Sequence, residues 1–140
     1  MDRELTENEK KKEFLNSYQK ALRRENEILD EIQRLRADKM FPSVVNDGMP
    51  KGSDQSDLSD YIVLLDEQIE LLKEERLERA KIRSRIEKSI RAMQDDDEQR
   101  VLRLRYIKGL KWNEVATEMG YSWKQTHRYH SCALQNFKMT

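Results

Sequence analysis

Residues 109–124, GLKWNEVATEMGYSWK, carry the local signals that decide the fold. Apolar residues recur at helical spacing over 112–119, which predicts a short helix with one apolar face. That face consists of Trp112, Val115, Ala116 and Met119. Gly120 can adopt the positive φ that ends this helix, and Ser122 can cap the helix that follows. A short helix, a tight turn with glycine and a capped helix together form a helix-turn-helix.

Two neighbouring helices complete a carboxy-terminal domain that we place at residues 95–140. The acidic run 95–97 favours the start of a helix over 98–108, and Gly109 is suited to ending it. The last helix is predicted to run from Ser122 to about Lys138. One side of it should pack in the core, and that side carries Thr126, Tyr129, His130, Ala133 and Phe137. The small side chain of Ala116 should let the helices cross closely.

Two long helices are predicted in residues 1–94. Apolar residues at steps of three and four predict the first over 8–38, and the Lys10–Lys12 run within it is expected to face solvent. Residues 39–56 contain both prolines and two of the four glycines, so they should form an irregular linker. The second helix is predicted over 57–93, where a seven-residue apolar repeat indicates a coiled-coil-like seam.

The partner of this seam can lie in the same chain or in another copy. An internal hairpin with the first helix is our first interpretation, and an oligomerising stalk that forms a homodimer is the alternative. Arg76, Arg79 and Arg83 interrupt the seam. They can set the register against acidic groups such as Glu25, or their stems can cover apolar neighbours while their charged ends reach water.

Composition supports an all-α protein. The chain has 140 residues, of which 39% are charged, and only four are Gly and two Pro. So few turn formers disfavour a many-stranded sheet. No apolar run approaches the ~20 residues of a bilayer-spanning helix, and the single cysteine, Cys132, cannot form an internal disulfide. We therefore expect a cytoplasmic protein without membrane contact.

Charge separates the two ends of the chain. Residues 98–140 hold eight Lys or Arg and three Glu, which favours a nucleic-acid-binding surface. On the last helix the face opposite the core side carries Lys124, His127, Arg128, Ser131 and Gln135. A helix-turn-helix places such a face in the major groove, where Arg and Lys can bond guanine and Gln can bond adenine. The DNA-binding candidates are Trp123, Lys124, Gln125, His127, Arg128, Ser131 and Lys111.

Residues 101–137 resemble the fourth region of bacterial sigma factors, which binds the upstream promoter element. The matching pieces are the run Leu-Arg-Leu-Arg-Tyr at 102–106, Trp112-x-Glu114-Val115-Ala116, Gly120-Tyr121-Ser122 and Ala133-Leu134. With its acidic helices and the linker residues Met49-Pro50-x-Gly52-Ser53, the whole chain is similar to phage and prophage transcriptional regulators of the RinA/ArpU type.

This resemblance implies base contacts at Trp123, Lys124, His127 and Arg128. It also implies that Arg105 pairs with Glu114 to brace two helices. Sigma factors often have an acidic residue at the position of Lys124, so their promoter preference does not transfer. No part of the chain corresponds to the sigma region that melts the promoter. The structural residues of the motif are Arg105, Trp112, Glu114, Ala116, Gly120, Ser122 and Tyr129.

Other site chemistries find no support in the sequence. His127 and Cys132 point about 140° apart on a helix, so we expect no metal site, and no cofactor is expected. No nucleophile and base pair or phosphate loop is present, so we expect no enzyme activity. The leading hypothesis is a sequence-specific DNA-binding regulator that acts with host RNA polymerase. Alternatives are a packaging component like a small terminase subunit, or a coiled-coil adaptor that binds polymerase or another protein without touching DNA.

Overall fold

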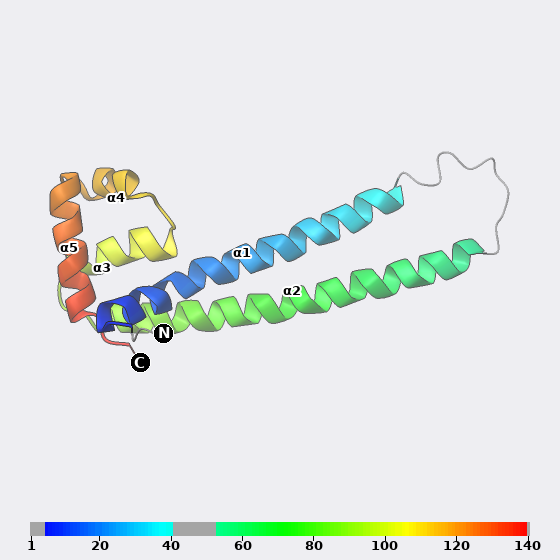
Figure 1. The fold of residues 1–140 in the computed structure, drawn as a ribbon, viewed down its shortest axis with the longest axis horizontal. Helices are drawn as coiled ribbons and strands as arrows, with labels where there is room; N and C mark the ends of the chain where they lie inside the picture. The colour runs from blue at the N-terminus through cyan, green and yellow to red at the C-terminus, as the bar shows by residue number, and fades with distance from the viewer. Residues whose placement is uncertain (1–4, 41–52, 140) are drawn as a thin grey trace. The chain divides into compact units, whose positions relative to one another are not determined.

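The computed structural model describes residues 5–40 and 53–139, with the backbone alone at 39–40 and 53–57. The described residues form helices and no strand, so the predicted all-α class is confirmed. Figure 1 shows the elements in chain order. They are α1 (Glu7–Met40), α2 (Ser53–Arg91), α3 (Asp96–Leu102), the π-helical segment η2 (Arg103–Ile107), α4 (Trp112–Met119) and α5 (Trp123–Asn136).

The two long helices extend further toward the linker than predicted, whereas α2 ends at Arg91, before the predicted end at residue 93. Helix α1 continues to Met40 and α2 begins at Ser53, so the irregular linker predicted over 39–56 is shorter at both ends. The physical reason is the position of the helix breakers, because both prolines and the two glycines of this stretch fall within 41–52. Those residues of the predicted linker lie outside the described part of the chain.

The chain divides into two compact units, and their boundary differs from the expected one between residues 94 and 95. The terminal unit contains the residues up to Ala21 together with those from Arg79 onward. The hairpin unit contains Leu22–Glu78. The carboxy-terminal helices therefore share a core with the first turns of α1 and the last turns of α2.

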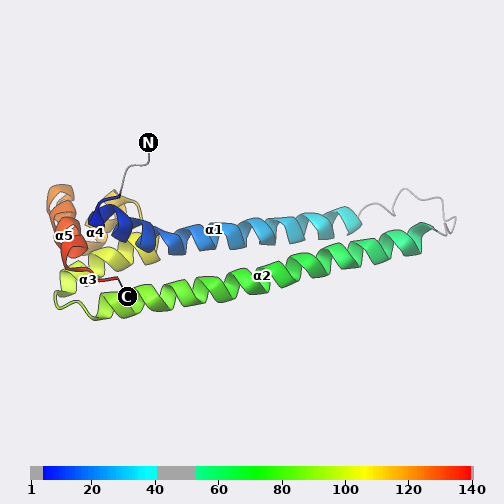
Figure 2. The same ribbon diagram turned by 60° about the horizontal axis from the view of Figure 1, so that its bottom comes forward.

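In the terminal unit, the start of α1 packs on the carboxy-terminal helices (Figure 2). Leu15 is fully buried, and the rings of Phe14 and Phe137 lie 6.1 Å apart. The Lys11 ammonium donates a hydrogen bond of 2.7 Å to the carbonyl of Leu134 in the last turn of α5. Lys11 thus satisfies a carbonyl at the negative end of that helix, and the expectation of a solvent-facing lysine run is wrong at this position.

Where the sequence predicts one helix over 98–108, the structure has α3 followed by the wider turn of η2. The amide of Lys108 donates to the carbonyl of Arg103, five residues earlier, at 2.9 Å. Gly109, with φ +72°, then turns the chain out of the helix. The Gln19 side chain donates to the carbonyls of Tyr106 at 3.1 Å and Ile107 at 3.0 Å. The widened turn thus leaves two carbonyls that a side chain of α1 satisfies.

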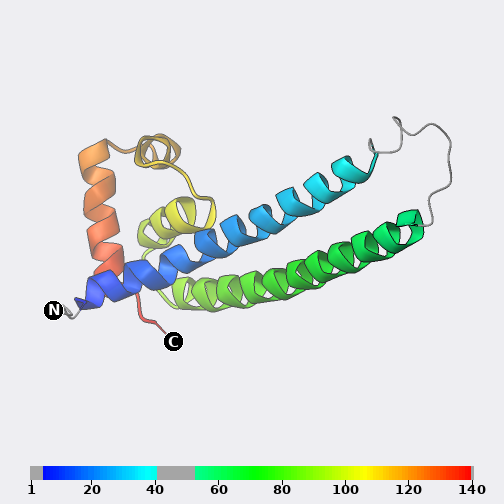
Figure 3. The same ribbon diagram turned by 45° about the vertical axis from the view of Figure 1, so that its right-hand side comes forward.

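In the hairpin unit, the remaining parts of α1 and α2 run antiparallel (Figure 3). Arg24 Nε lies 3.2 Å from Glu75 Oε2, and Arg76 Nε lies 2.9 Å from Glu25 Oε1. The internal hairpin is therefore formed, and the expected register contact between a seam arginine and Glu25 is confirmed. In the terminal unit the seam arginine Arg83 makes a different contact, because its guanidinium carbon lies 6.0 Å from the centroid of the Tyr18 ring.

Candidate nucleic-acid interface

The turn between α4 and α5 fixes where α5 begins. Gly120 ends α4 in the left-handed conformation, with φ 72° and ψ 26°. The Ser122 hydroxyl accepts a hydrogen bond of 3.1 Å from the amide of Gln125, and the Thr126 hydroxyl donates to the carbonyl of Ser122 at 2.8 Å. These contacts follow the local sequence signals, and they satisfy an amide that the first turn of a helix otherwise leaves open.

The outer face of α5 is exposed and carries no negative charge. Lys124, Gln125, Arg128 and Ser131 are exposed on it, whereas Thr126, His130, Ala133 and Leu134 are buried beneath it. No residue of α5 is acidic. Lys111, the residue before α4, is also exposed. The structure thus presents most of the DNA-binding candidates to solvent.

An aromatic stack lies at the amino end of α5. The ring centroids of Trp123 and His127 are 3.9 Å apart, and those of His127 and Trp112 are 4.3 Å apart. The Arg105 guanidinium lies 4.7 Å from the Trp112 centroid. Trp123 is 61% exposed, more than any other large apolar side chain in the described residues. Two DNA-binding candidates, Trp123 and His127, and two predicted structural residues, Trp112 and Arg105, therefore form one continuous stack.

His127 is held differently from the base contact that the sequence predicts. It is half-buried between the two indoles, and no hydrogen-bond partner for its buried Nε2 lies in the described part of the chain. Burial, together with the nearby Arg105 charge, lowers the pKa of its imidazole below 6.5. A neutral ring in van der Waals contact with Trp123 can support that indole from behind.

Arg105 and Glu114 do not pair as the resemblance implies. The Arg105 guanidinium donates to the carbonyl of Leu110 at 2.9 Å. Glu114 accepts a hydrogen bond of 3.0 Å from the amide of Lys111, which caps the start of α4. The expected brace is therefore replaced by two local contacts, because each side chain reaches an open backbone group of its own turn.

Tyr129 is not the buried aromatic residue that the helical periodicity predicts. It is half-buried at the edge of the core, where its ring stacks on that of Tyr121 at 5.0 Å. The Tyr121 hydroxyl donates to Asp97 at 2.8 Å, and this bond raises the pKa of the phenol to about 12. Tyr129 thus supports a link between the turn and α3, while the next residue, His130, is buried.

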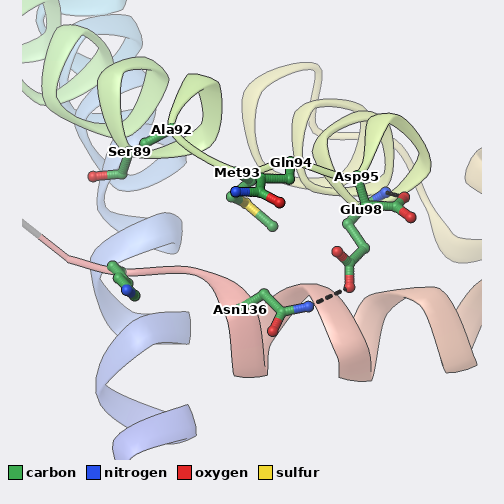
Figure 4. A pocket seen from close by; sticks show the side chains of 8 residues that line it. Ser89, Ala92, Met93, Gln94, Asp95, Glu98 and Asn136 are labelled. Atoms are coloured by element: carbon green, nitrogen blue, oxygen red, sulfur yellow. Dashed lines mark hydrogen bonds between the residues drawn. The ribbon is translucent and has the colours of Figure 1, made fainter.

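A polar pocket of about 600 Å³ lies beside the start of α3 within the terminal unit. Figure 4 shows the buried Glu98 carboxylate pointing toward Asn136, whose amide donates to it at 2.7 Å. This bond links the first turn of α3 to the last turn of α5. Among the described residues, no three His, Cys, Asp or Glu side chains are grouped to hold a metal, and no helix is long and apolar enough to cross a membrane.

Sequence reasoning missed the residues that attach this interface to α1. Lys11 contacts the end of α5, and Gln19 contacts the end of η2. Both partners are more than eighty positions away along the chain, so no local pattern indicates them. The only signal in the sequence was the apolar face of the first helix, which indicates that this helix packs against another element but not which one.

Comparison with protein families gives a match over most of the chain. A family model described as a protein of unknown function, DUF1492, matches residues 34–138. The chain belongs to the DUF1492 family. The matched range includes all of α3, α4 and α5 and excludes the segment of α1 that holds Lys11 and Gln19. No curated protein and no solved structure matches the chain.

Proposed function

We propose that this member of the DUF1492 family is a sequence-specific DNA-binding transcriptional regulator. The observation that supports it best is the outer face of α5, which is exposed, basic and without an acidic residue. It begins at a capped turn after a short helix, the arrangement in which a helix-turn-helix presents its second helix to the major groove. In this reading α5 is the recognition helix.

The exposed side chains match the chemistry of base edges. Arg128 can donate two parallel hydrogen bonds to the O6 and N7 atoms of one guanine. Gln125 can bond the N6 and N7 atoms of adenine. Lys124 and Lys111 offer single mobile charges suited to phosphates, which supply affinity without sequence preference.

Trp123 is assigned an apolar contact in the same groove. An indole that is 61% exposed gains by burial against a partner, and a thymine methyl group or a deoxyribose is an apolar surface within the groove. Because His127 packs behind this indole at 3.9 Å, we assign His127 the role of positioning Trp123 rather than of reading a base.

The biological setting of this proposal comes from the resemblance to RinA/ArpU-type regulators. On that basis we propose that the protein acts in the cytoplasm of a bacterial host and activates phage or prophage genes together with host RNA polymerase. Packaging of DNA, as by a small terminase subunit, and an adaptor role without DNA contact are the competing assignments.

The test is DNA binding by the full chain. A site is first selected from random duplexes, and affinity for the selected and scrambled duplexes is then measured at two salt concentrations. Arg128→Ala should cost roughly 1–3 kcal/mol on the selected site and relax the preference at one base pair. Lys111→Ala should weaken both duplexes equally and reduce the salt slope by about one.

A matched control is Lys20→Ala, which removes an exposed lysine of α1 and should change neither affinity. Circular dichroism confirms that each variant is folded. Binding without any sequence preference would favour the packaging role. A folded chain that binds no duplex at low salt would refute the proposal in favour of an adaptor.

A further inference from the structure

Trp112 of α4 is held on three sides by side chains of η2 and α5. The Arg105 guanidinium lies 4.7 Å from the centroid of its ring, and the centroid of the His127 ring lies 4.3 Å from it. The His130 ring meets it edge-on, with centroids 4.6 Å apart. Because Trp112 is half-buried among these partners, its position depends on where they stand.

The π-helical segment η2 fixes two of the three partners. Arg105 belongs to η2, and its guanidinium donates to the carbonyl of Leu110 at 2.9 Å. The hydroxyl of Tyr106, the next residue of η2, lies 2.8 Å from Nε2 of His130. A change in the backbone of this one turn would therefore move both of these partners of Trp112 together.

The backbone of η2 is in turn supported by Gln19 of α1. The side-chain nitrogen of Gln19 donates to the carbonyls of Tyr106 at 3.1 Å and Ile107 at 3.0 Å. Single π-helical turns are rare and occur frequently at functional sites. Since a carbonyl without a partner is costly away from water, the two hydrogen bonds from Gln19 favour this widened turn.

The other end of the stack lies on the proposed recognition face of α5. Among the described residues, the ring partner of Trp123 is His127, with centroids 3.9 Å apart. Trp123 is otherwise 61% exposed. An exposed indole can adopt several rotamers, and ordering it on binding costs free energy. Support from His127 therefore prepares Trp123 for a contact with DNA before binding.

We propose that Gln19 is a positioning residue for the DNA contact of Trp123 and that it acts through η2. Gln19 holds the backbone of η2, and Arg105 of η2 holds Trp112. Trp112 packs on His127, which supports Trp123. The inference rests on the proposed function, because it concerns the same recognition face. It gives the start of α1, which lies outside the range that the family model matches, a part in reading DNA.

The size of the effect is limited by the ordering of one side chain. Fixing one flexible side chain before binding strengthens affinity by about two- to tenfold. We therefore expect a loss of about fivefold when Gln19 no longer holds η2. Lys124 and Arg128 are exposed on the same helix and take no part in this stack within the described residues. Their contributions to binding should be unchanged.

The test uses Gln19→Met in the full chain. Methionine keeps the length of the side chain and adds no charge, but it cannot donate to the two carbonyls of η2. Gln33→Met is the matched control, because it makes the same substitution at an exposed position of α1. Arg105→Met breaks the next contact of the series and is a second variant with the same expected result. Circular dichroism verifies that each variant is folded.

The first measurement needs no DNA. Trp112 and Trp123 are the two tryptophans of the chain, so isotope-labelled tryptophan gives two indole signals in a nuclear magnetic resonance spectrum, which Trp123→Phe assigns. Gln19→Met should shift both signals, and Gln33→Met should shift neither. An unchanged Trp123 signal in folded Gln19→Met overturns the inference, whether or not the protein binds DNA.

The second measurement is affinity for the selected duplex. Gln19→Met should weaken binding about fivefold in the wild-type chain but less than about twofold in a Trp123→Ala chain. Its effect should multiply with that of Arg128→Ala, which lies outside the stack. An equal loss in the Trp123→Ala chain overturns the inference, because Gln19 would then act on the whole fold rather than on Trp123.

The two proposals can fail separately. A folded wild type that binds no duplex refutes the proposed function, and the indole signals then still decide whether Gln19 positions Trp123. A chain that binds the selected duplex with an affinity independent of Gln19 refutes the inference alone.

Discussion

Acidification is expected to weaken the terminal unit through one buried side chain, His130. Its Nε2 lies 2.8 Å from the Tyr106 hydroxyl, and its ring meets Trp112 edge-on, with centroids 4.6 Å apart. Burial, with a smaller effect of nearby positive charges, lowers the pKa of this imidazole from 6.5 to about 4. A proton on His130 would place a charge in a site that stabilises the neutral ring.

The sign and size of the effect follow from this shift. In the unfolded chain the same imidazole titrates near pH 6.5. Between pH 6.5 and about 4 the unfolded chain binds a proton that the folded chain does not, so the free energy of unfolding decreases as the pH falls. One pKa unit corresponds to about 1.4 kcal/mol. The total loss is therefore on the order of 3 kcal/mol, absent above pH 7 and nearly complete at pH 4.

Urea unfolding of the wild type and of His130→Gln between pH 7 and pH 4 measures this loss. Carboxyl groups titrate in both proteins, so the difference between the two curves isolates His130. The variant starts from a lower free energy of unfolding at pH 7, because the amide packs less well than the ring. The two curves should then converge by about 3 kcal/mol toward pH 4. Parallel curves over this range would refute the reasoning.

Three further predictions concern the packing of the terminal unit. Gly109→Ala and Gly120→Ala both place a Cβ on a residue with φ +72°. At Gly109 this Cβ would lie 2.9 Å from Oε1 of Gln19, the side chain that caps η2, whereas at Gly120 nothing lies within 4 Å. Gly109→Ala should therefore cost about 1–2 kcal/mol more in thermal unfolding, and equal costs would contradict this packing. Tyr129→Ala should lower the free energy of unfolding by only about 1 kcal/mol, because it removes a half-exposed stacking contact, and a loss above about 3 kcal/mol would show a core role. Lys11→Met should cost about 1–2 kcal/mol in urea unfolding while Lys20→Met costs almost nothing, and equal losses would exclude the helix-end contact.

The turn and caps could be predicted because their signals are local. Gly120 needs only its own φ to end a helix, and Ser122 needs only the amide three residues later. Helical periodicity predicts less sharply which residues are buried. Tyr129 and His130 differ by one residue, or 100°, at the edge of one apolar face. A period of 3.6 residues does not show which of them the neighbouring helices bury.

Contacts set by distant parts of the chain could not be predicted. The π-helical turn of η2 is completed by Gln19, and the stack of Arg105 on Trp112 depends on how α4 crosses η2. The resemblance to sigma factors implied a pair between Arg105 and Glu114 instead. It could not show that nearby backbone groups, the carbonyl of Leu110 and the amide of Lys111, bind these side chains in this chain. The all-α class was predictable from composition. The long apolar repeat predicted that α2 has a helical partner, but it did not decide between α1 and another copy of the chain.

The hydrogen bond between Lys11 and Leu134 also constrains how the protein is made. Its two ends are separated by 123 positions, so the first helix leaves the ribosome long before its last partner exists. The hairpin unit, Leu22–Glu78, is synthesised in between, and once folded it shortens the loop that the two parts of the terminal unit must close. Each halving of the effective loop saves only about 0.6 kcal/mol, so the main gain is in the speed of the final docking step. Loss of the last turn of α5 together with Phe137 would remove the contacts that Lys11 and Phe14 make there, and such chains should be degraded faster.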